Sequence, residues 1–326
     1  MSKINWTYKK LNELGFVGRG KSKHRPRNDV LLYGGSYPFI QTGDIKAAEL
    51  YISNYTQTYN DKGLSQSKLW EPGTLCITIA ANIGETAILK IKACFPDSIV
   101  GFIADPNISD VRFVKYSLDT KKQQMQSISK GATQDNLPLE KLLSLKFLVP
   151  PVFTQQKIAS ILSAYDDLIE NNTRRIQILE EMAQRIYREW FVNFRFPGYE
   201  KVKFVDSEMG KIPEGWEISN LEHIAELVKD KFHESQHYNL PLLDLSRIPR
   251  KSLVLSDFGK CDEIKTSRII FKEGNILFGA IRPYFHKVVM APCDGVTNIS
   301  VFVLKSTNIV GNCFLFNLLF SDEVVA

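Results

Sequence analysis

Two short motifs in this sequence of 326 residues match the patterns of enzymes. In the first, Gly15, Gly20, Lys21 and Ser22 fit the G-x-x-x-x-G-K-[ST] loop that binds nucleotide phosphates. That chemistry needs a buried strand before the glycines and a helix after the Lys-Ser pair. Here the preceding segment is polar with a helical pattern, and Pro26 breaks the following one. A P-loop nucleotide hydrolase that uses Lys21 is therefore the alternative hypothesis, and we favour another role.

The second motif, H-E-S-Q-H at residues 233–237, matches the zinc-binding H-E-x-x-H pattern. A metalloprotease needs this motif on a helix, so that both histidines face one metal ion. Charged flanks and Pro241 favour a polar loop instead. The sequence also lacks a recognisable methyltransferase cofactor turn and any evident Ser/His/Asp or Cys/His set. We predict no catalytic residues, no metal site and no cofactor in this chain.

A basic segment overlaps the first motif. Its cations are Arg19, Lys21, Lys23, Arg25 and Arg27, accompanied by His24. Closely spaced cations can neutralise the phosphates of a nucleic-acid backbone, although a solvated charge run is the plainer explanation. We predict a mobile DNA-binding loop here, with Gln41, Thr42 and Lys46 reading base edges beside it.

Composition limits the remaining classes. The chain is 44% hydrophobic and 24% charged, as in globular proteins, and its net charge is only +5. Any attraction to DNA must therefore come from local clusters. The five cysteines are scattered without a C-x-x-C pair, and the N-terminus lacks an apolar signal core. We expect a cytoplasmic protein that does not enter a membrane.

Residues 154–191 form the segment around which the chain is organised. They contain no Gly or Pro and repeat apolar residues in a heptad pattern, which predicts one long helix that needs a partner. Asn172 interrupts the seam, as buried amides do where they set register. The predicted pairing and docking positions are Ile158, Leu162, Tyr165, Ile169, Asn172, Ile176, Leu179, Ile186 and Trp190.

The flanking segments have different periods. Residues 37–113 alternate polar and apolar residues between turn signals, which predicts a mostly antiparallel sheet. Trp6–Leu14 and residues 111–128 have helical patterns, and another helix and strand lead into the long helix. Residues 197–215 are rich in Gly, Pro and charge, which predicts a linker.

After the linker the sequence repeats itself at an offset of about 200, which indicates an internal duplication. Residues 41–45 align with 242–245, 70–75 with 271–276, and 98–102 with 298–302. The loops differ, because the basic segment has no counterpart in the second copy. Candidate DNA-binding residues of that copy are Arg247, Arg250, Lys251, Arg282 and Lys287.

Several local sequences resemble those of specificity subunits of type I restriction-modification systems. They are residues 131–137 (GATQDNL), 149–151 (VPP), 155–158 (QQKI), 188–198 (REWFVNFRFPG) and 210–216 (GKIPEGW). The resemblance runs over the whole chain. It implies an α+β fold with two sheet-rich target-recognition domains joined by a long coiled-coil-type spacer helix.

The resemblance also implies partners and domain boundaries. Two recognition domains read the halves of an interrupted site on double-stranded DNA, held apart by two antiparallel helices on which modification subunits dock. Those subunits use S-adenosylmethionine, and restriction subunits add ATP- and Mg²⁺-dependent translocation and cleavage. We expect domain 1 at residues 1–150, the spacer helix at 151–196, the linker at 197–215 and domain 2 at 216–326.

The second conserved helix of the family has no counterpart in the sequence. We therefore expect a C-terminally truncated form with an incomplete second domain, which self-associates through its single spacer helix. A purely structural coiled-coil adaptor is the third hypothesis, and it predicts no DNA binding at any salt concentration.

Overall fold

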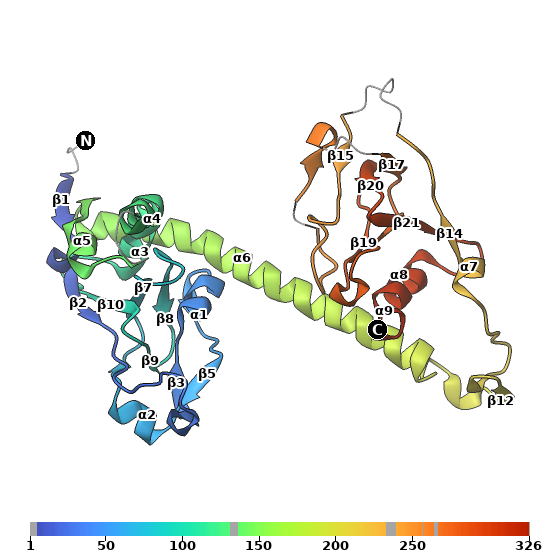
Figure 1. Cartoon of the computed structure of the whole chain (residues 1–326), viewed down its shortest axis with the longest axis horizontal. Helices are drawn as coiled ribbons and strands as arrows, with labels where there is room; N and C mark the ends of the chain where they lie inside the picture. The colour runs from blue at the N-terminus through green and yellow to red at the C-terminus, as the bar shows by residue number, and fades with distance from the viewer. Residues whose placement is uncertain (1–4, 131–135, 233–238, 256, 264–266, 326) are drawn as a thin grey trace. The chain divides into compact units, whose positions relative to one another are not determined.

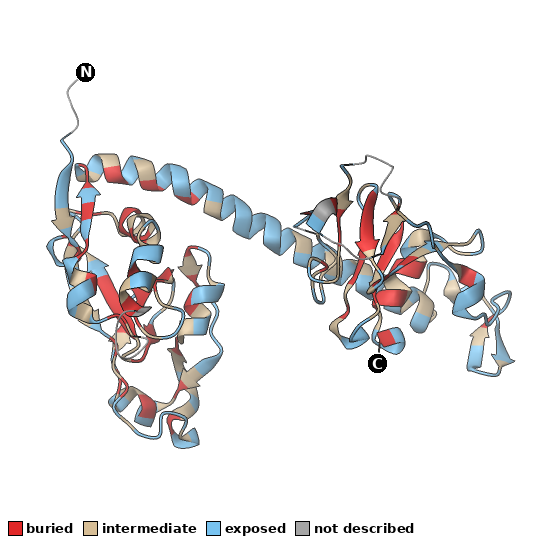
Figure 2. Ribbon diagram, turned by 45° about the horizontal axis from the view of Figure 1, so that its top comes forward, coloured by how far each residue is buried: buried red, intermediate tan, exposed pale blue. Residues whose placement is uncertain are grey.

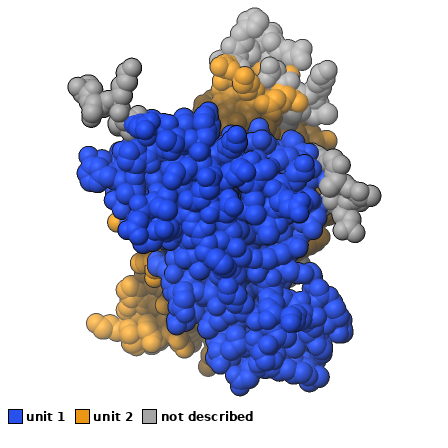
Figure 3. Space-filling model, turned by 90° about the vertical axis from the view of Figure 1, so that its left-hand side faces the viewer, with its two compact units in different colours: residues 1–172 blue, residues 173–326 orange. Residues whose placement is uncertain are grey.

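The computed structural model describes residues 5–130, 136–232, 239–255, 257–263 and 267–325. They belong to two compact units, residues 1–172 and 173–326, which Figure 3 shows in different colours.

Unit 1 is built on two β-sheets. The first has the strand order β2-β10-β7-β8-β4, the second has the order β5-β3-β9-β6, and β1 pairs separately with β11. Most of the neighbouring strands are antiparallel, as predicted, with β3–β9 and β4–β8 parallel. The bounds are β1 (Thr7–Lys10), β2 (Gly15–Arg19), β3 (Tyr33–Phe39), β4 (Tyr51–Ile52), β5 (Gln57–Tyr59), β6 (Leu69–Trp70), β7 (Leu75–Thr78), β8 (Thr86–Leu89), β9 (Ala93–Cys94), β10 (Ile99–Ala104) and β11 (Lys146–Val149).

Helices cover the first sheet of unit 1. The predicted helix at 111–128 is confirmed as α3 (Val111–Asp119) and α4 (Lys122–Lys130). α3 starts where it does because the Asp110 carboxylate accepts two backbone N–H groups of the first turn. Phe113 and Leu118 then bury their side chains in the core. The shorter helices are α1 (Thr42–Ala47), α2 (Asp61–Ser65), α5 (Leu139–Ser144) and the 3₁₀ turns Leu11–Glu13 and Val30–Leu32.

The predicted helix at Trp6–Leu14 is wrong. Thr7–Lys10 is strand β1, paired in antiparallel register with β11, and a single 3₁₀ turn follows. The partner strand lies more than 130 residues later in the chain, with Thr7 opposite Val149 and Lys10 opposite Lys146, and a local periodicity cannot reveal such hydrogen bonds. Tertiary pairing has overridden a weak helical pattern.

Unit 2 repeats this arrangement. Its sheets have the orders β14-β21-β18-β19 and β16-β15-β20-β17, and β12 and β13 form a separate hairpin within the predicted linker. The strands are β12 (Phe204–Ser207), β13 (Gly210–Pro213), β14 (Ala225–Leu227), β15 (Pro241–Leu242), β16 (Gly259–Lys260), β17 (Arg268–Phe271), β18 (Ile276–Gly279), β19 (Val288–Met290), β20 (Gly295–Asn298) and β21 (Val301–Ser306). The helices are α7 (Leu221–Ile224), α8 (Asn312–Phe320), α9 (Asp322–Val325) and the 3₁₀ turns Tyr199–Lys201, Cys261–Glu263 and Pro283–Phe285.

The matching strand orders confirm the duplication, but two of the aligned segments need correction. β10 starts at Ile99 and β21 at Val301, an offset of 202, so the alignment of 98–102 with 298–302 is two residues out. Phe39 lies beside Cys94 and Leu242 lies beside Val296 in the equivalent parallel pairs. Gln41 therefore corresponds to Asp244, and not to Leu242. The sequence alignment paired the aspartates of residues 41–45 and 242–245. The paired strands instead show that Gln41, and not Asp44, corresponds to Asp244.

The predicted long helix is confirmed. α6 (Val152–Tyr187) is 36 residues long and continues into a π-helical turn, Arg188–Val192. Its buried residues are Gln155, Ala159 and Ser163, which repeat every four positions and pack on unit 1. Much of the rest of α6 is exposed, as Figure 2 shows, whereas strands β7 and β8 are buried throughout.

Candidate nucleic-acid interface

The basic segment of unit 1 is fastened to the sheet beneath it. The Lys21 amide donates to the Phe95 carbonyl at 3.0 Å. The amides of Lys23 and His24 both donate to Oε1 of Gln66, at 2.5 and 3.0 Å. The His24 ring lies 2.7 Å from Asp29. These contacts give the loop a defined shape from which its side chains project.

Three arginines of this loop converge on Asp97. Arg27 makes a 2.6 Å ion pair with the carboxylate, Arg25 lies 3.7 Å from it, and Arg19 donates to the Asp97 backbone oxygen at 2.6 Å. The side chains of Arg25 and Arg27 keep about half of their surface exposed, at 53% and 51%. Surface pairs of this kind hold a cation in place weakly, so it can exchange its partner for a phosphate.

The P-loop geometry is absent at the matched residues. Gly15 begins strand β2, and no α-helix follows Ser22 among residues 23–41. Both glycines have a packing explanation, because a Cβ at Gly15 would lie 2.1 Å from the Ile103 oxygen and one at Gly20 would lie 2.2 Å from the Pro96 oxygen. The structure gives no support to nucleotide hydrolysis by Lys21.

A groove of about 710 Å³ lies beside the basic loop. Arg27 lines it together with Gln41 and Thr42, so the structure brings three of the predicted residues to one surface. Lys46 is exposed on α1 outside the groove lining. Further polar residues of the lining are Ser22, Asn28, Gln57 and Ser98, and its floor includes Tyr33, Phe39 and Tyr59.

Tyr33, which lines the groove, and Asp29, in the adjoining loop, have shifted pKa values. Burial raises the pKa of Tyr33 to about 12, and its hydroxyl donates to the Arg27 carbonyl at 2.6 Å. The Leu31 amide and His24 lower the pKa of Asp29. At neutral pH Tyr33 is thus neutral and Asp29 charged; Tyr33 bonds the loop to β3, and Asp29 holds the loop through His24 and the Leu31 amide.

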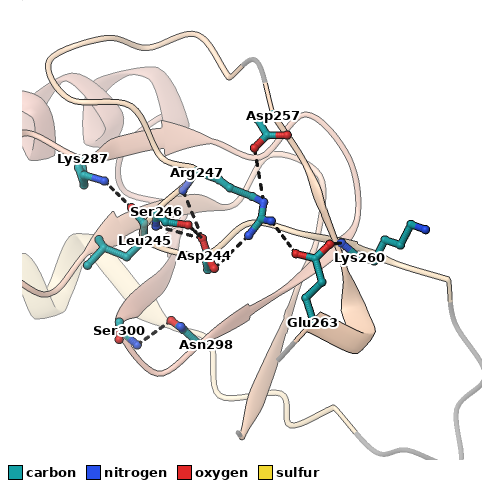
Figure 4. A network of polar contacts seen from close by, with 10 residues as sticks. All are labelled: Asp244, Leu245, Ser246, Arg247, Asp257, Lys260, Glu263, Lys287, Asn298 and Ser300. Carbon is teal, nitrogen blue, oxygen red and sulfur yellow. Dashed lines mark hydrogen bonds and ion pairs between the residues drawn. The ribbon is translucent and has the colours of Figure 1, made fainter. Parts of the chain in front are cut away.

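The corresponding region of unit 2 contains an ion-pair network centred on Arg247 (Figure 4). Its guanidinium lies 3.1 Å from Asp244, 2.6 Å from Glu263 and 3.6 Å from Asp257. Burial would raise the pKa of Asp244, but the Ser246 hydroxyl and the Arg247 charge outweigh it and lower the pKa overall. Arg247 is thus held by three carboxylates and is 19% exposed, whereas Arg25 and Arg27 share one carboxylate and are about half exposed.

The other predicted cations of unit 2 gather around the turn Pro283–Phe285. The Arg250 guanidinium lies 3.8 Å from the centre of the Phe285 ring, and the Lys251 amide donates to the Phe285 carbonyl at 3.3 Å. Arg282 precedes the turn with a φ of 54°. Lys287 donates to the Leu245 carbonyl, and burial lowers its pKa, with Arg250 adding to the effect. Their contact with DNA stays a prediction.

Most of the heptad seam of α6 is open to solvent. Leu162, Ile169 and Leu179 are 39%, 48% and 64% exposed. Tyr165, Asn172, Ile186 and Trp190 are also exposed, while Ile158 and Ile176 are half-buried. A row of mostly exposed apolar residues along one helix is typical of a protein-binding surface.

Sequence reasoning missed Asp97, Asn28 and Gln57. Asp97 reaches Arg27 across 70 residues, and such a contact leaves no local pattern. Gln57 could have been found from the sequence, because it stands two residues before the apolar Tyr59, a spacing that predicts a short strand with a polar end. The structure pairs this strand with β3. The H-E-S-Q-H motif at 233–237 and residues 131–135 lie outside the described residues.

The described residues contain neither a candidate metal site nor a candidate membrane span. Within those ranges, no group of three His, Cys, Asp or Glu side chains could hold a metal ion. None of the helices that the structure describes is long and apolar enough to cross a membrane.

Residues 3–181 match the family model described as the type I restriction modification DNA specificity domain. The MjaIX type I restriction enzyme specificity subunit of Methanocaldococcus jannaschii is 30% identical over 228 residues, which cover 68% of this chain and 52% of the relative. The MjaVIII specificity subunit of the same organism is 24% identical over 306 residues, covering 88% and 68%. The matched part of this chain thus spans about half of the first relative.

The fold has a solved counterpart. The crystal structure of a type I restriction-modification system S subunit from M. genitalium superposes with a TM-score of 0.62 at 14% identity. The superposition covers 99% of this chain and 79% of that one. The likeness supports a shared architecture of sheet-rich domains and long helix.

Proposed function

Because this chain belongs to the type I restriction-modification DNA specificity family, we propose that it is the DNA-reading subunit of a type I restriction-modification complex. It carries no catalytic residue of its own. Other subunits supply the adenine methylation that uses S-adenosylmethionine and the restriction chemistry that uses ATP and Mg²⁺. Such a complex acts on DNA in the cytoplasm.

The proposed division of labour follows the sequence. Residues 1–150 read one half of an interrupted site on double-stranded DNA, and residues 216–326 read the other. Residues 151–196 are the spacer helix that docks modification subunits, and 197–215 are a linker. The exposed seam of α6 supports a docking role for the helix, either with a modification subunit or with a second copy of the chain.

The observation that carries the proposal is the groove of unit 1. The basic loop borders it through Arg27, and Gln41, Thr42, Asn28 and Gln57 supply amide and hydroxyl groups. Half-exposed arginines suit the sequence-independent contacts to phosphates, and amides suit the reading of base edges. A nucleotide hydrolase would need phosphate-binding geometry that the Gly15–Ser22 segment lacks. An adaptor would need no such groove.

Co-expression with a modification subunit tests the proposal. We expect genome-wide mapping of methylated adenines to give one interrupted sequence motif, absent from cells that contain the modification subunit alone. A complex that assembles but methylates no defined motif would contradict DNA reading by this chain. DNA binding that is undetectable at every salt concentration would favour the adaptor.

A further inference from the structure

Gln41 and Gln57 form an amide pair in the groove of unit 1. Nε2 of Gln41 donates to Oε1 of Gln57 at 2.5 Å, and both residues line the groove. They come from different elements, because Gln41 precedes α1 and Gln57 begins β5 (Figure 1). Neither glutamine is buried. Two polar side chains that could each be hydrated separately are instead bonded to one another.

The backbone fixes this pair firmly. Gln57 lies opposite Phe39 in the β3–β5 ladder, and Phe39 and Tyr59 are buried beneath the groove with their rings stacked 4.0 Å apart. The backbone amide of Gln41 donates to the Asp44 carboxylate at 2.8 Å, and this bond holds the turn into α1. Both glutamines thus project from rigid positions, as residues that recognise a ligand by geometry must.

The pair keeps hydrogen-bonding capacity for a ligand. A primary amide has two N–H donors and one oxygen acceptor, so one bond to Gln57 leaves Gln41 an N–H and its oxygen. The Gln57 side chain keeps both of its N–H donors, and the Gln41 side chain keeps one. One donor beside one acceptor complements N7 and the N6 amino group of adenine in the major groove.

Unit 2 has different chemistry at the equivalent strand ends. Gly259 lies opposite Leu242 as Gln57 lies opposite Phe39, so glycine replaces Gln57. A Cβ at Gly259 would lie 2.5 Å from the guanidinium carbon of Arg247, which therefore fills the space of the missing side chain. Gln41 corresponds to Asp244, a partner of Arg247. The same frame thus carries an amide pair in one unit and an arginine with carboxylates in the other.

We propose that Gln41 and Gln57 act as one base-reading unit that selects an A·T pair in the half-site bound by unit 1, with Gln57 as a specificity-determining residue. This inference rests on the proposed function. The Arg27 loop contributes affinity without sequence information, whereas the amide pair contributes sequence preference at one position. Two units with the same strand arrangement but different polar side chains at the strand ends would read different half-sites.

Selection of bound sequences from a random DNA pool tests the proposal, with the full chain in complex with its modification subunit. We expect the variants Gln57→Leu, Gln41→Leu and the double variant each to lose preference for A·T at the same single position. The expected loss is about tenfold or more, and it should not add up in the double variant. The other half-site and the salt dependence should stay as in the wild type. Gln124→Leu, which removes an exposed glutamine of α4, is the control and should change nothing.

The outcomes separate this inference from the proposed function. If the wild type selects a motif and the Gln57→Leu variant selects the same one, the amide pair does not read a base and the inference is overturned. A uniform loss of affinity in a folded Gln57→Leu variant, with the motif unchanged, overturns it as well. If the wild-type complex selects no motif, the proposed function itself fails.

Discussion

The side chain of Gln155 is bonded to the backbone amide of Asp110, 45 residues earlier in the chain, at 3.1 Å. The same side chain donates to the carbonyls of Ile108 and Pro150, both at 2.9 Å, and it is fully buried. One glutamine in the first turns of α6 therefore satisfies three backbone groups of unit 1. It attaches the helix at the residue where α3 is capped.

Replacing Gln155 by Leu should destabilise unit 1. The variant keeps a similar volume but leaves buried backbone groups without partners, and each such group costs about 1–3 kcal/mol. Urea denaturation should show a lower midpoint. The neighbouring Gln156→Leu variant alters an exposed residue and should change stability by less than about 0.5 kcal/mol. Equal effects of the two changes would mean that the buried bonds contribute little.

The Arg247 network should make unit 2 sensitive to acid. The pKa of Glu263 is lowered by the Lys260 amide and by Arg247, and that of Asp244 is also lowered. A carboxyl group whose folded pKa is lowered stabilises the fold above its ordinary pKa, near 4, and loses that contribution as the pH falls below it. We expect the stability of unit 2 to decrease between about pH 5 and pH 3.

The variant Arg247→Met separates this network from general acid effects. It should be less stable than the wild type at pH 7 and lose less further stability on acidification, when urea midpoints are compared at several pH values. Arg195→Met breaks an exposed ion pair with Glu189 and serves as the control. Wild-type and Arg247→Met midpoints that fall in parallel would show that the network does not cause the acid sensitivity.

Local periodicity predicted those parts of the fold that depend on neighbours in sequence. The heptad seam of α6 and the helical pattern of 111–128 needed only residues three to seven positions apart. The strand pairing of Thr7–Lys10 with Lys146–Val149, in contrast, depends on a distant partner, and the helix expected there was wrong. Repetition of the whole pattern was visible, but its exact register was not, because loops of different length shift the offset.

At the candidate site, residue type alone marked basic residues that differ in their surroundings and missed a polar residue that lines the groove. Arg247 and Arg27 are equally basic in the sequence, yet one lies among three carboxylates and the other is half-exposed beside a groove. Gln57 belongs to no recognised motif, and only its place in a short strand pattern marked it. Its significance comes from the fold, which sets it against Gln41.

The basic loop should determine how strongly DNA binding depends on salt. If each of its five cations contacts one phosphate, the loop contributes a slope of about −4.5 to the logarithm of the affinity against the logarithm of salt concentration. Replacing Lys21, Lys23, Arg25 and Arg27 together by Ala should reduce the magnitude of the slope by up to about 3.6, or 0.9 for each cation. Fluorescence anisotropy titrations between 50 and 200 mM salt, roughly the range over which such slopes are measured, would give the values.

Four exposed lysines elsewhere in the chain provide the matched control. They are Lys201, Lys203, Lys211 and Lys229, and their total charge equals that of the four loop cations replaced. Their replacement by Ala should leave most of the slope in place. A slope that is unchanged in the loop variant would remove the loop from the interface, whatever the control shows.

The open seam of α6 should bind a second helix, and in the isolated chain we expect that helix to come from another copy. Ile169 and Leu179 lie on the seam with much of their apolar surface exposed, so pairing would remove that surface from water. Sedimentation should detect dimers at micromolar concentration. Replacing both residues by Lys should give monomers, because each dimer would then bury uncompensated charges. Glu181→Lys, on an exposed position outside the seam, should leave the dimer intact.

Replacing Asn172 by Ile should strengthen association of the helices and make their register less specific, since a buried amide at this position lowers stability but fixes the register. A wild-type chain that sediments as a monomer at micromolar concentration would contradict self-association and leave a modification subunit as the partner of this seam.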